Sequence, residues 1–154
     1  MDMSRAGASH PDIVIEIAPN ARNLAILRHF IASLARDLKL SSEEALQLEM
    51  CVDEACANSI EGIRLREGDL ADSCVRIELK MESSAIHIVI QDSGQDFTQA
   101  FYKATPLHDF TDRTRNRGYG LQIIKTFMDV VDYVHDPQAG NRLYLVKYFT
   151  HASE

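Results

Sequence analysis

Two alternating runs of residues, separated by a short polar turn, constrain the fold of this chain most strongly. Apolar side chains occupy every second position from Val75 to Met81 and again from Ile86 to Ile90, with Glu82-Ser83-Ser84 between the runs. A period of two places one side of a strand in the core and the other side toward solvent. The runs therefore predict an antiparallel hairpin with one face covered by other elements.

The residues before this hairpin show a strand pattern and then two helix patterns. A strand is predicted at 13–17, followed by a helix that Asn20 is expected to cap and whose apolar stripe extends to Leu38. Ser41 and Glu44 form the Ser-x-x-Glu pattern of a capping box, which predicts the start of a second, longer helix. Two helices and one strand should therefore precede the hairpin.

The residues after the hairpin continue the alternation. A polar stretch at 98–116 has no predicted element, and a helix is expected from about Gly118 to Val131. A short strand near Tyr133, a turn at 139–141 and a last strand at 143–149 should complete the chain. The expected fold class is α+β: a two-layer sandwich in which helices cover one face of a mainly antiparallel, mixed sheet.

Length, charge and cysteine spacing limit the classes of function that the protein can have. The chain has 154 residues, for which we expect one domain at 12–150 after a flexible tail at 1–11 that lacks the apolar core of a signal peptide. No apolar run approaches the ~20 residues that span a bilayer, and the three cysteines lack metal-ligand spacing. A net charge of −7 argues against nucleic acid as the main partner. We expect a cytoplasmic protein with no membrane partner.

Glu54 and Asn58 form the first of three fragments that carry chemistry. Residues four apart share a helix face, so these two side chains should project together from the second helix. An amide oxygen suits a hydrated Mg²⁺, and a carboxylate beside it can act on a nucleophile. By itself a Glu-x-x-x-Asn pattern is typical of an ordinary solvated helix face. Its position relative to the other two fragments favours the functional interpretation.

The second fragment is Asp92-Ser93-Gly94, at the end of a predicted strand. A carboxylate there can accept a hydrogen bond from an exocyclic amine in a half-buried pocket, and Gly94 lets a purine approach the backbone. Alone, the fragment is typical of a hairpin turn. The third fragment, 117–121, has glycines before a helix, where free amide groups and the helix dipole favour an anion. Together they predict a nucleotide site.

Together the fragments resemble the GHKL (Bergerat-fold) ATPase superfamily, and within it the stand-alone anti-sigma factor serine/threonine-protein kinases. The resemblance extends from about Ile13 to Phe149. It implies that Asn58 coordinates Mg²⁺, that Glu54 is the general base and that Asp92 contacts adenine. Arginines before the third fragment, Arg113 among them, are expected near the phosphates of ATP or ADP. The other expected nucleotide-binding residues are Gly94, Arg115, Arg117, Gly118, Tyr119, Gly120 and Leu121.

The resemblance also implies partners and a function. Members of the family bind a sigma factor and phosphorylate Ser or Thr on an anti-sigma factor antagonist of the STAS type, and a homodimer is left open. Three positions depart from the family pattern: Gly62 stands where a His is common, Asp96 replaces a Gly, and Asn141 replaces the Thr of a Gly-Thr. These departures support an alternative function, a catalytically weak binding module that acts by protein–protein interaction. An unaltered Glu54–Asn58 pair favours the kinase.

Overall fold

The computed structural model describes residues 10–66, 72–106 and 120–150, and it forms a five-stranded sheet backed by helices. The strand order is β1-β2-β3-β5-β4, and every neighbouring pair is antiparallel. The strands are β1 (Ile13–Ile17), β2 (Val75–Met81), β3 (Ala85–Asp92), β4 (Val130–Asp136) and β5 (Gly140–Tyr148). The expected two-layer α+β class is confirmed, and the described pairings are antiparallel throughout rather than mixed.

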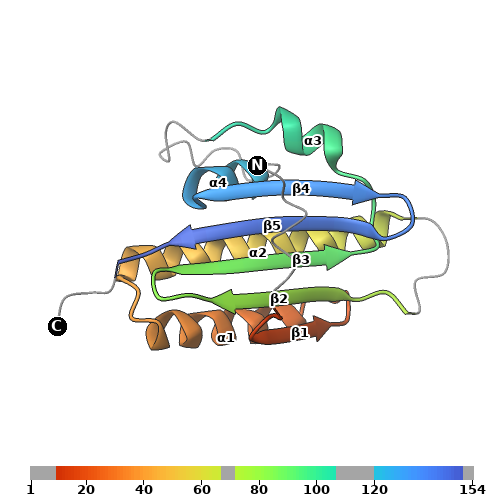
Figure 1. Ribbon diagram of the computed structural model, residues 1–154. Coiled ribbons are helices and arrows are strands. Elements are labelled where there is room, and N and C mark those ends of the chain that lie inside the picture. Colours follow the sequence, from red (N-terminus) through yellow and green to blue (C-terminus); the bar gives the residue numbers. More distant parts are fainter. Residues whose placement is uncertain (1–9, 67–71, 107–119, 151–154) are drawn as a thin grey trace.

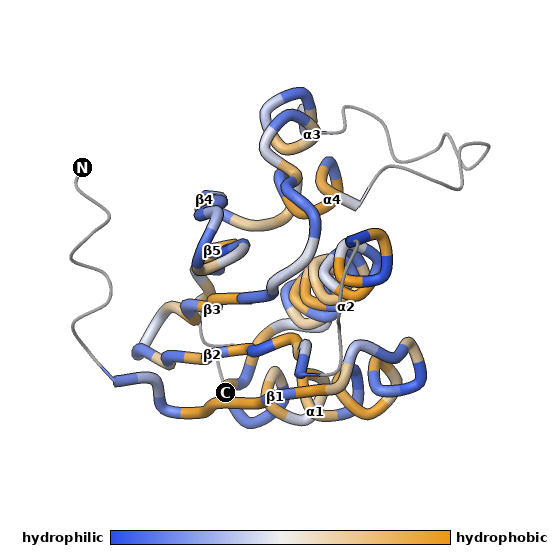
Figure 2. Tube along the Cα trace, turned by 90° about the vertical axis from the view of Figure 1, so that its right-hand side faces the viewer, coloured by the Kyte–Doolittle hydropathy of each residue, from blue (hydrophilic) through white to orange (hydrophobic). Residues whose placement is uncertain are grey.

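Four helices complete the described part of the chain: α1 (Asn23–Asp37), α2 (Ser42–Leu65), α3 (Thr98–Lys103) and α4 (Gly120–Phe127). Figures 1 and 2 show α1, α2 and α4 behind one face of the sheet, while α3 lies beyond the β4 edge. Helix α2 is the longest and runs behind the central strands. It contacts both α1 and α4, so it positions most of the interior.

The predicted hairpin carries the centre of the core. β2 and β3 pair so that Ile77 lies opposite Ile90 and Leu79 lies opposite Ile88, and all four side chains are buried. Because side chains alternate along each strand, this register directs the apolar set toward the helices. The opposite face of β2 carries charged residues, for example Arg76, which pairs with Glu16 on β1 at 2.8 Å.

The start of α2 forms as its sequence predicts. The Ser41 side chain accepts a hydrogen bond from the Glu44 backbone N–H at 3.2 Å, and the Glu44 carboxylate accepts one from the Ser41 N–H at 2.9 Å. A reciprocal cap of this kind stabilises a helix by about 1 kcal/mol. It fixes where α2 begins and therefore which of its residues face the sheet.

Three element predictions were wrong. Asn20 does not cap α1, because its side chain accepts from the Arg22 N–H in a turn and the helix begins at Asn23. The helix predicted to reach Val131 ends at Phe127, and Val131 belongs to β4. The stretch at 98–116 contains α3 at Thr98–Lys103, a helix of six residues that its polar sequence does not reveal.

No helix in the described ranges is both long enough and apolar enough to cross a membrane. Cys51 and Cys56 are buried in α2, and neither forms a disulfide. Burial raises the pKa of both thiols to about 12, so each stays protonated at neutral pH.

Candidate nucleotide site

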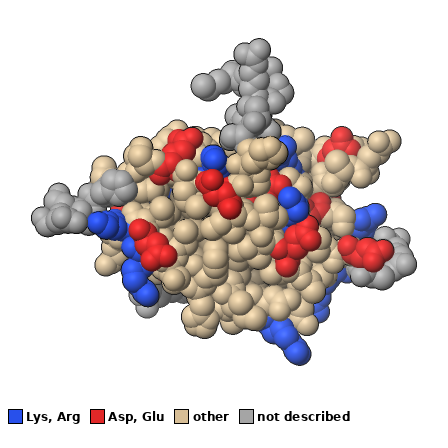
Figure 3. All heavy atoms as spheres, turned by 60° about the horizontal axis from the view of Figure 1, so that its bottom comes forward, with Lys and Arg blue, Asp and Glu red and all other residues tan. Residues whose placement is uncertain are grey.

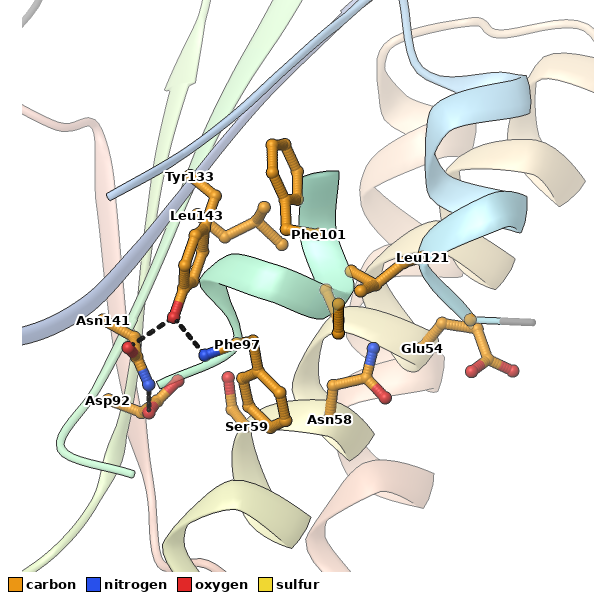
Figure 4. Close-up of a pocket in the computed structure, with 13 residues that line it drawn as sticks. Glu54, Asn58, Ser59, Asp92, Phe97, Phe101, Leu121, Tyr133, Asn141 and Leu143 are labelled. Atoms are coloured by element: carbon orange, nitrogen blue, oxygen red, sulfur yellow. Dashed lines mark hydrogen bonds between the residues drawn. The ribbon is translucent and has the colours of Figure 1, made fainter. Parts of the chain in front are cut away.

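A cavity of about 270 Å³ lies between α2, α3, α4 and the sheet (Figure 4). Its lining includes Glu54 and Asn58 from α2, Asp92 from the end of β3, and Gly120 and Leu121 from the start of α4. These residues come from all three predicted fragments. Their side chains therefore meet in one cavity although they lie far apart in the sequence.

Glu54 and Asn58 lie at the α4 end of the cavity. They project from one face of α2, as their spacing predicts, and Gly120 packs against both. A Cβ atom placed on Gly120 would lie 2.7 Å from Glu54 Oε2 and 3.2 Å from Asn58 Nδ2. The missing side chain at Gly120 therefore leaves room for the carboxylate and the amide beside the first turn of α4.

The environment of Glu54 increases its basicity. Burial raises the pKa of this carboxyl above its ordinary value, and the negative charge of the neighbouring Asp53 raises it further. A carboxylate whose pKa moves toward neutrality is a better general base at physiological pH. Asp53 itself pairs with Arg28 of α1 at 2.6 Å, so it is an ion-pair partner rather than a free exposed charge.

Asp92 lies at the opposite end of the cavity and is only 8% exposed. Its Oδ1 atom accepts hydrogen bonds from the Gly94 N–H at 2.8 Å and from Asn141 Nδ2 at 2.9 Å. Within the described residues no donor contacts its second oxygen, Oδ2. This buried acceptor suits an exocyclic amine, because a donor that binds it would be shielded from water.

Asn141 is the residue that fixes Asp92, and sequence reasoning missed this role. It lies directly opposite Asp92 in the β3–β5 register and is 3% exposed. Its Oδ1 accepts from the Tyr133 hydroxyl at 2.6 Å (Figure 4). The same oxygen accepts from His135 Nδ1 at 2.8 Å, and Nδ2 also donates to the Gln95 carbonyl at 2.8 Å. Since an amide oxygen can only accept, Nδ1 of His135 carries the proton.

All the hydrogen-bonding capacity of the Asn141 side chain is therefore used within the protein. Its two N–H bonds point at Asp92 and Gln95, and its oxygen has two donors. Asn141 consequently holds the carboxylate of Asp92 in place without needing a ligand. The departure from Gly-Thr at this position replaces a hydroxyl with a buried amide that has a complete set of partners.

The remaining departures also have structural explanations. A Cβ atom at Gly62 would lie 2.7 Å from the ring of Phe97, so this ring fills the space beside α2.

A Cβ atom at Gly94 would lie 2.6 Å from the backbone of Gly62 and Ile63. Gly94 therefore allows the turn after β3 to approach α2, and it does not line the cavity as expected for a purine contact.

Asp96, the second altered position, bonds to Thr98, the first residue of α3. Its Oδ1 atom accepts from the backbone N–H of Thr98 at 2.8 Å and from the Thr98 hydroxyl at 2.5 Å. These bonds from Thr98 lower the pKa of the Asp96 carboxyl. The residue is absent from the cavity lining, so its charge is used at the helix start.

Several predicted residues cannot be placed. Arg113, Arg115, Arg117, Gly118 and Tyr119 lie outside the described residues. The described lining adds three aromatic residues that the sequence did not single out: Phe97, Phe101 and Tyr133. Phe101 lies in α3, which was not predicted, and Phe97 lies immediately before it. Tyr133 lies in β4, where a strand was predicted but no contact with the site.

The donor set fits a nucleotide and one metal ion. Asn58 offers a hard amide oxygen for Mg²⁺, Asp92 offers a buried acceptor for a base, and apolar and aromatic side chains lie between them. In the described ranges no group of three or more His, Cys, Asp or Glu side chains could hold a metal. An ion at Asn58 would therefore draw other ligands from a bound phosphate or from water.

Comparisons with known proteins agree with this geometry. Residues 17–147 match the family model described as histidine kinase-like ATPase domain. The chain is 25% identical over 140 residues to the anti-sigma F factor of Clostridium kluyveri, which covers 90% of this chain and 95% of that protein. The anti-sigma F factors of Halalkalibacterium halodurans and Geobacillus stearothermophilus are 24% and 23% identical and cover 88% of this chain, with 91% and 90% of their own lengths covered. The chain belongs to the family of histidine kinase-like ATPase domains.

Proposed function

We propose that this protein is an anti-sigma factor and a protein serine/threonine kinase, which uses ATP and Mg²⁺ to phosphorylate an anti-sigma factor antagonist. The observation that carries the proposal is the convergence of Glu54, Asn58 and Asp92 on one cavity. The relatives named anti-sigma F factor support a sigma factor as partner. A regulator of transcription in this class works in the cytoplasm, and its antagonist is expected to be a STAS-type protein.

The cavity suggests how the residues would divide the reaction. Asp92 would accept a hydrogen bond from the adenine amine, and Asn58 would hold Mg²⁺, which supplies positive charge to the phosphates. A Ser or Thr hydroxyl oxygen of the antagonist would attack the γ-phosphorus, the bond from that phosphorus to the β–γ bridging oxygen of ATP would break, and ADP would leave. Glu54 accepts the proton of that hydroxyl, a role that its raised pKa favours.

The alternative of a non-catalytic binding module loses two of its supports. Asp96 is directed to Thr98 rather than to the cavity, and Asn141 supplies a buried partner to Asp92. Both departures are therefore compatible with a bound nucleotide. The carboxylate of Glu54, half-buried and next to Asn58, is the feature that a binding module would not require.

The deciding experiment combines purified protein, Mg-ATP and candidate STAS-type antagonists, with the intact mass of each antagonist as readout. The native protein should add one phosphate to its antagonist. Glu54→Gln should bind ATP and Mg²⁺ normally and lose transfer by about 10²-fold or more, whereas Asn58→Ala should lose the metal dependence of ATP binding. Glu61→Gln, on an exposed position of the same helix, is the matched control.

Native protein that binds ATP and a sigma factor but transfers no phosphate to any candidate would favour the binding module. Identical behaviour of Glu54→Gln and Asn58→Ala, with both folded and both unable to bind ATP, would contradict the assigned roles. The control should match the native protein in both measurements.

We also propose that two copies associate through the β1–α1 side of the molecule. β1 is an edge strand, and an apolar groove lies between it and α1, lined by Ile15, Ile17, Leu27 and the 70% exposed Ile26. Figure 3 shows a broad area without charged side chains on this side. Ile26→Asp should shift the sedimentation coefficient to that of a monomer, whereas Val134→Asp, on the opposite edge strand, should not.

A further inference from the structure

Helix α3 forms one wall of the cavity. Ala100 and Phe101 from this helix, and Phe97 immediately before it, line the cavity together with Asp92. The N-terminal end of α3 is held against β4, because the Phe97 N–H donates a hydrogen bond to the Tyr133 hydroxyl at 2.8 Å. The rings of Phe101 and Tyr133 also pack with their centroids 5.4 Å apart. A helix of six residues is too short to hold its position by itself.

Lys125 of α4 contacts the other end of this wall. Its ammonium group donates hydrogen bonds to the Phe101 carbonyl and, at 2.9 Å, to the Ala104 carbonyl, and it lies 4.1 Å from the centroid of the Phe101 ring. The last carbonyls of a helix have no partner within the helix and carry partial negative charge. A cation is therefore well placed here, and it adds an attraction to the aromatic face.

The same residue connects two walls of the cavity. α4 contributes Gly120 and Leu121 to the lining, and Lys125 follows them by about one and a half turns. Burial lowers the pKa of Lys125, so the amine is partly withdrawn from water and held by protein groups. Removing the amine would leave two carbonyls without their donor and would free the second end of α3.

We propose that Lys125 is a positioning residue that fixes α3 against α4 and thereby closes the base-binding half of the cavity. This inference rests on the proposed nucleotide site and assigns a further residue to it. Lys125 acts through the wall that it holds and does not contact the nucleotide. Its amine already has two carbonyl acceptors and one ring, which distinguishes it from a lysine that binds phosphate.

The test compares three variants by calorimetric titration with adenosine and with Mg-ATP. Lys125→Met keeps the aliphatic stem and removes the donors, Lys125→Arg keeps donors, and Lys103→Met makes the same change at an exposed lysine of α3. Lys125→Met should weaken the binding of adenosine and of Mg-ATP by the same factor, about tenfold, which corresponds to about 1.4 kcal/mol of binding free energy. Lys125→Arg should restore most of the affinity, and Lys103→Met should match the native protein.

An equal loss of affinity for the two ligands is the decisive result, because a cavity wall around the base affects the binding of adenosine as much as that of ATP. A lower affinity for Mg-ATP with an unchanged affinity for adenosine would identify Lys125 as a phosphate ligand and overturn the proposal. Unchanged affinity for both ligands would also overturn it. No rescue by Lys125→Arg would show that the site needs the shape of lysine and not its donors, and would contradict a role for the hydrogen bonds that the ammonium group donates.

Hydrogen exchange of the ligand-free protein supplies a readout that does not depend on nucleotide. The N–H groups of Phe101 and Ala104 donate to the Phe97 and Ala100 carbonyls, and both should exchange faster in Lys125→Met than in Lys103→Met.

If native protein bound neither adenosine nor ATP, the proposed function would fail, and this inference about base binding would fail with it. If native protein bound both and only the effect of Lys125→Met were missing, this inference alone would fail. Faster exchange in α3 with unchanged adenosine affinity would reduce Lys125 to a structural role.

Discussion

Replacement of Tyr133 by Phe tests the buried network behind the cavity. The Tyr133 hydroxyl donates to Asn141 at 2.6 Å and accepts from the Phe97 N–H at 2.8 Å, and the side chain is 7% exposed. Tyr133→Phe removes a hydrogen bond worth about 1 kcal/mol and leaves the Phe97 N–H without its acceptor, which costs about 1–3 kcal/mol. The free energy of unfolding at pH 7 should therefore fall by about 2–4 kcal/mol.

The same residue predicts a loss of stability at alkaline pH. Burial raises the pKa of Tyr133 to about 12, and the charges of Asp96 and Asp92 contribute. A group whose folded pKa exceeds its unfolded value near 10 gives stability that is complete below pH 10 and is lost as the pH rises toward 12. By about pH 11 the native protein should lose about 1.4 kcal/mol from this residue, and Tyr133→Phe should lack this loss.

Urea denaturation followed by circular dichroism at pH 7, 9, 10 and 11 measures both effects. The difference between the native protein and Tyr133→Phe isolates Tyr133 from the other titrating groups. Tyr102→Phe is the matched control, because it removes the same hydroxyl from a residue that is 69% exposed and lies outside the network. A Tyr133→Phe variant as stable as the native protein at pH 7, or with the same alkaline loss, would refute this reasoning.

Three further predictions concern the site itself. Asp92→Asn should weaken ATP and ADP binding with the fold intact, and native protein should bind GTP poorly; equal affinity for ATP and GTP in calorimetry would contradict the assignment to adenine. Asp96→Gly should change ATP affinity by less than about twofold, because screening and the bonds to Thr98 keep its charge from the cavity, but it should lower the melting temperature. Gly120→Ala should reduce phosphoryl transfer by about tenfold or more with little change in melting temperature, since its Cβ would displace the end of Glu54; a normal transfer rate would show that this approach is unimportant.

The elements with strong local patterns could be predicted from the sequence. The hairpin of β2 and β3 follows from strict alternation, and the start of α2 follows from Ser41 and Glu44, whose interaction needs only neighbouring residues. Glu54 and Asn58 could likewise be placed on one helix face by their spacing alone. Local information was sufficient wherever the physical cause lay within one element.

Two of the wrong element predictions failed because the cause lies in tertiary contacts. The apolar residues after Phe127 continue at a spacing that suits a helix, but Val130 and Val131 pair with β5 and so belong to a strand. Helix α3 depends on Lys125 and Tyr133, which are distant in the sequence. For short elements, such contacts override local propensity.

The same limit explains the missed part of the site. Asn141 lies in a turn sequence, and nothing nearby shows that its amide would meet Asp92. Only the antiparallel register of β3 and β5 places these two residues opposite each other. The role of a residue whose partners lie across a sheet therefore becomes visible only when the register is known.

The position of β5 between β3 and β4 has a consequence for when the cavity is assembled during synthesis. Strands β1, β2 and β3 can pair in the order in which the ribosome releases them, but the neighbour of β3 on its other side begins only at Gly140. Gly140 has a φ of +89°, and a Cβ atom there would lie 2.2 Å from the Asp92 carbonyl oxygen, so this first residue of β5 packs tightly against the backbone at the end of β3. A nascent chain that has released α2 and β3 therefore lacks the β5 side of the cavity until Asn141 and Leu143 have left the exit tunnel. A stalled or shortened product that ends before β5 would carry Glu54, Asn58 and Asp92 without the amide that holds the Asp92 carboxylate.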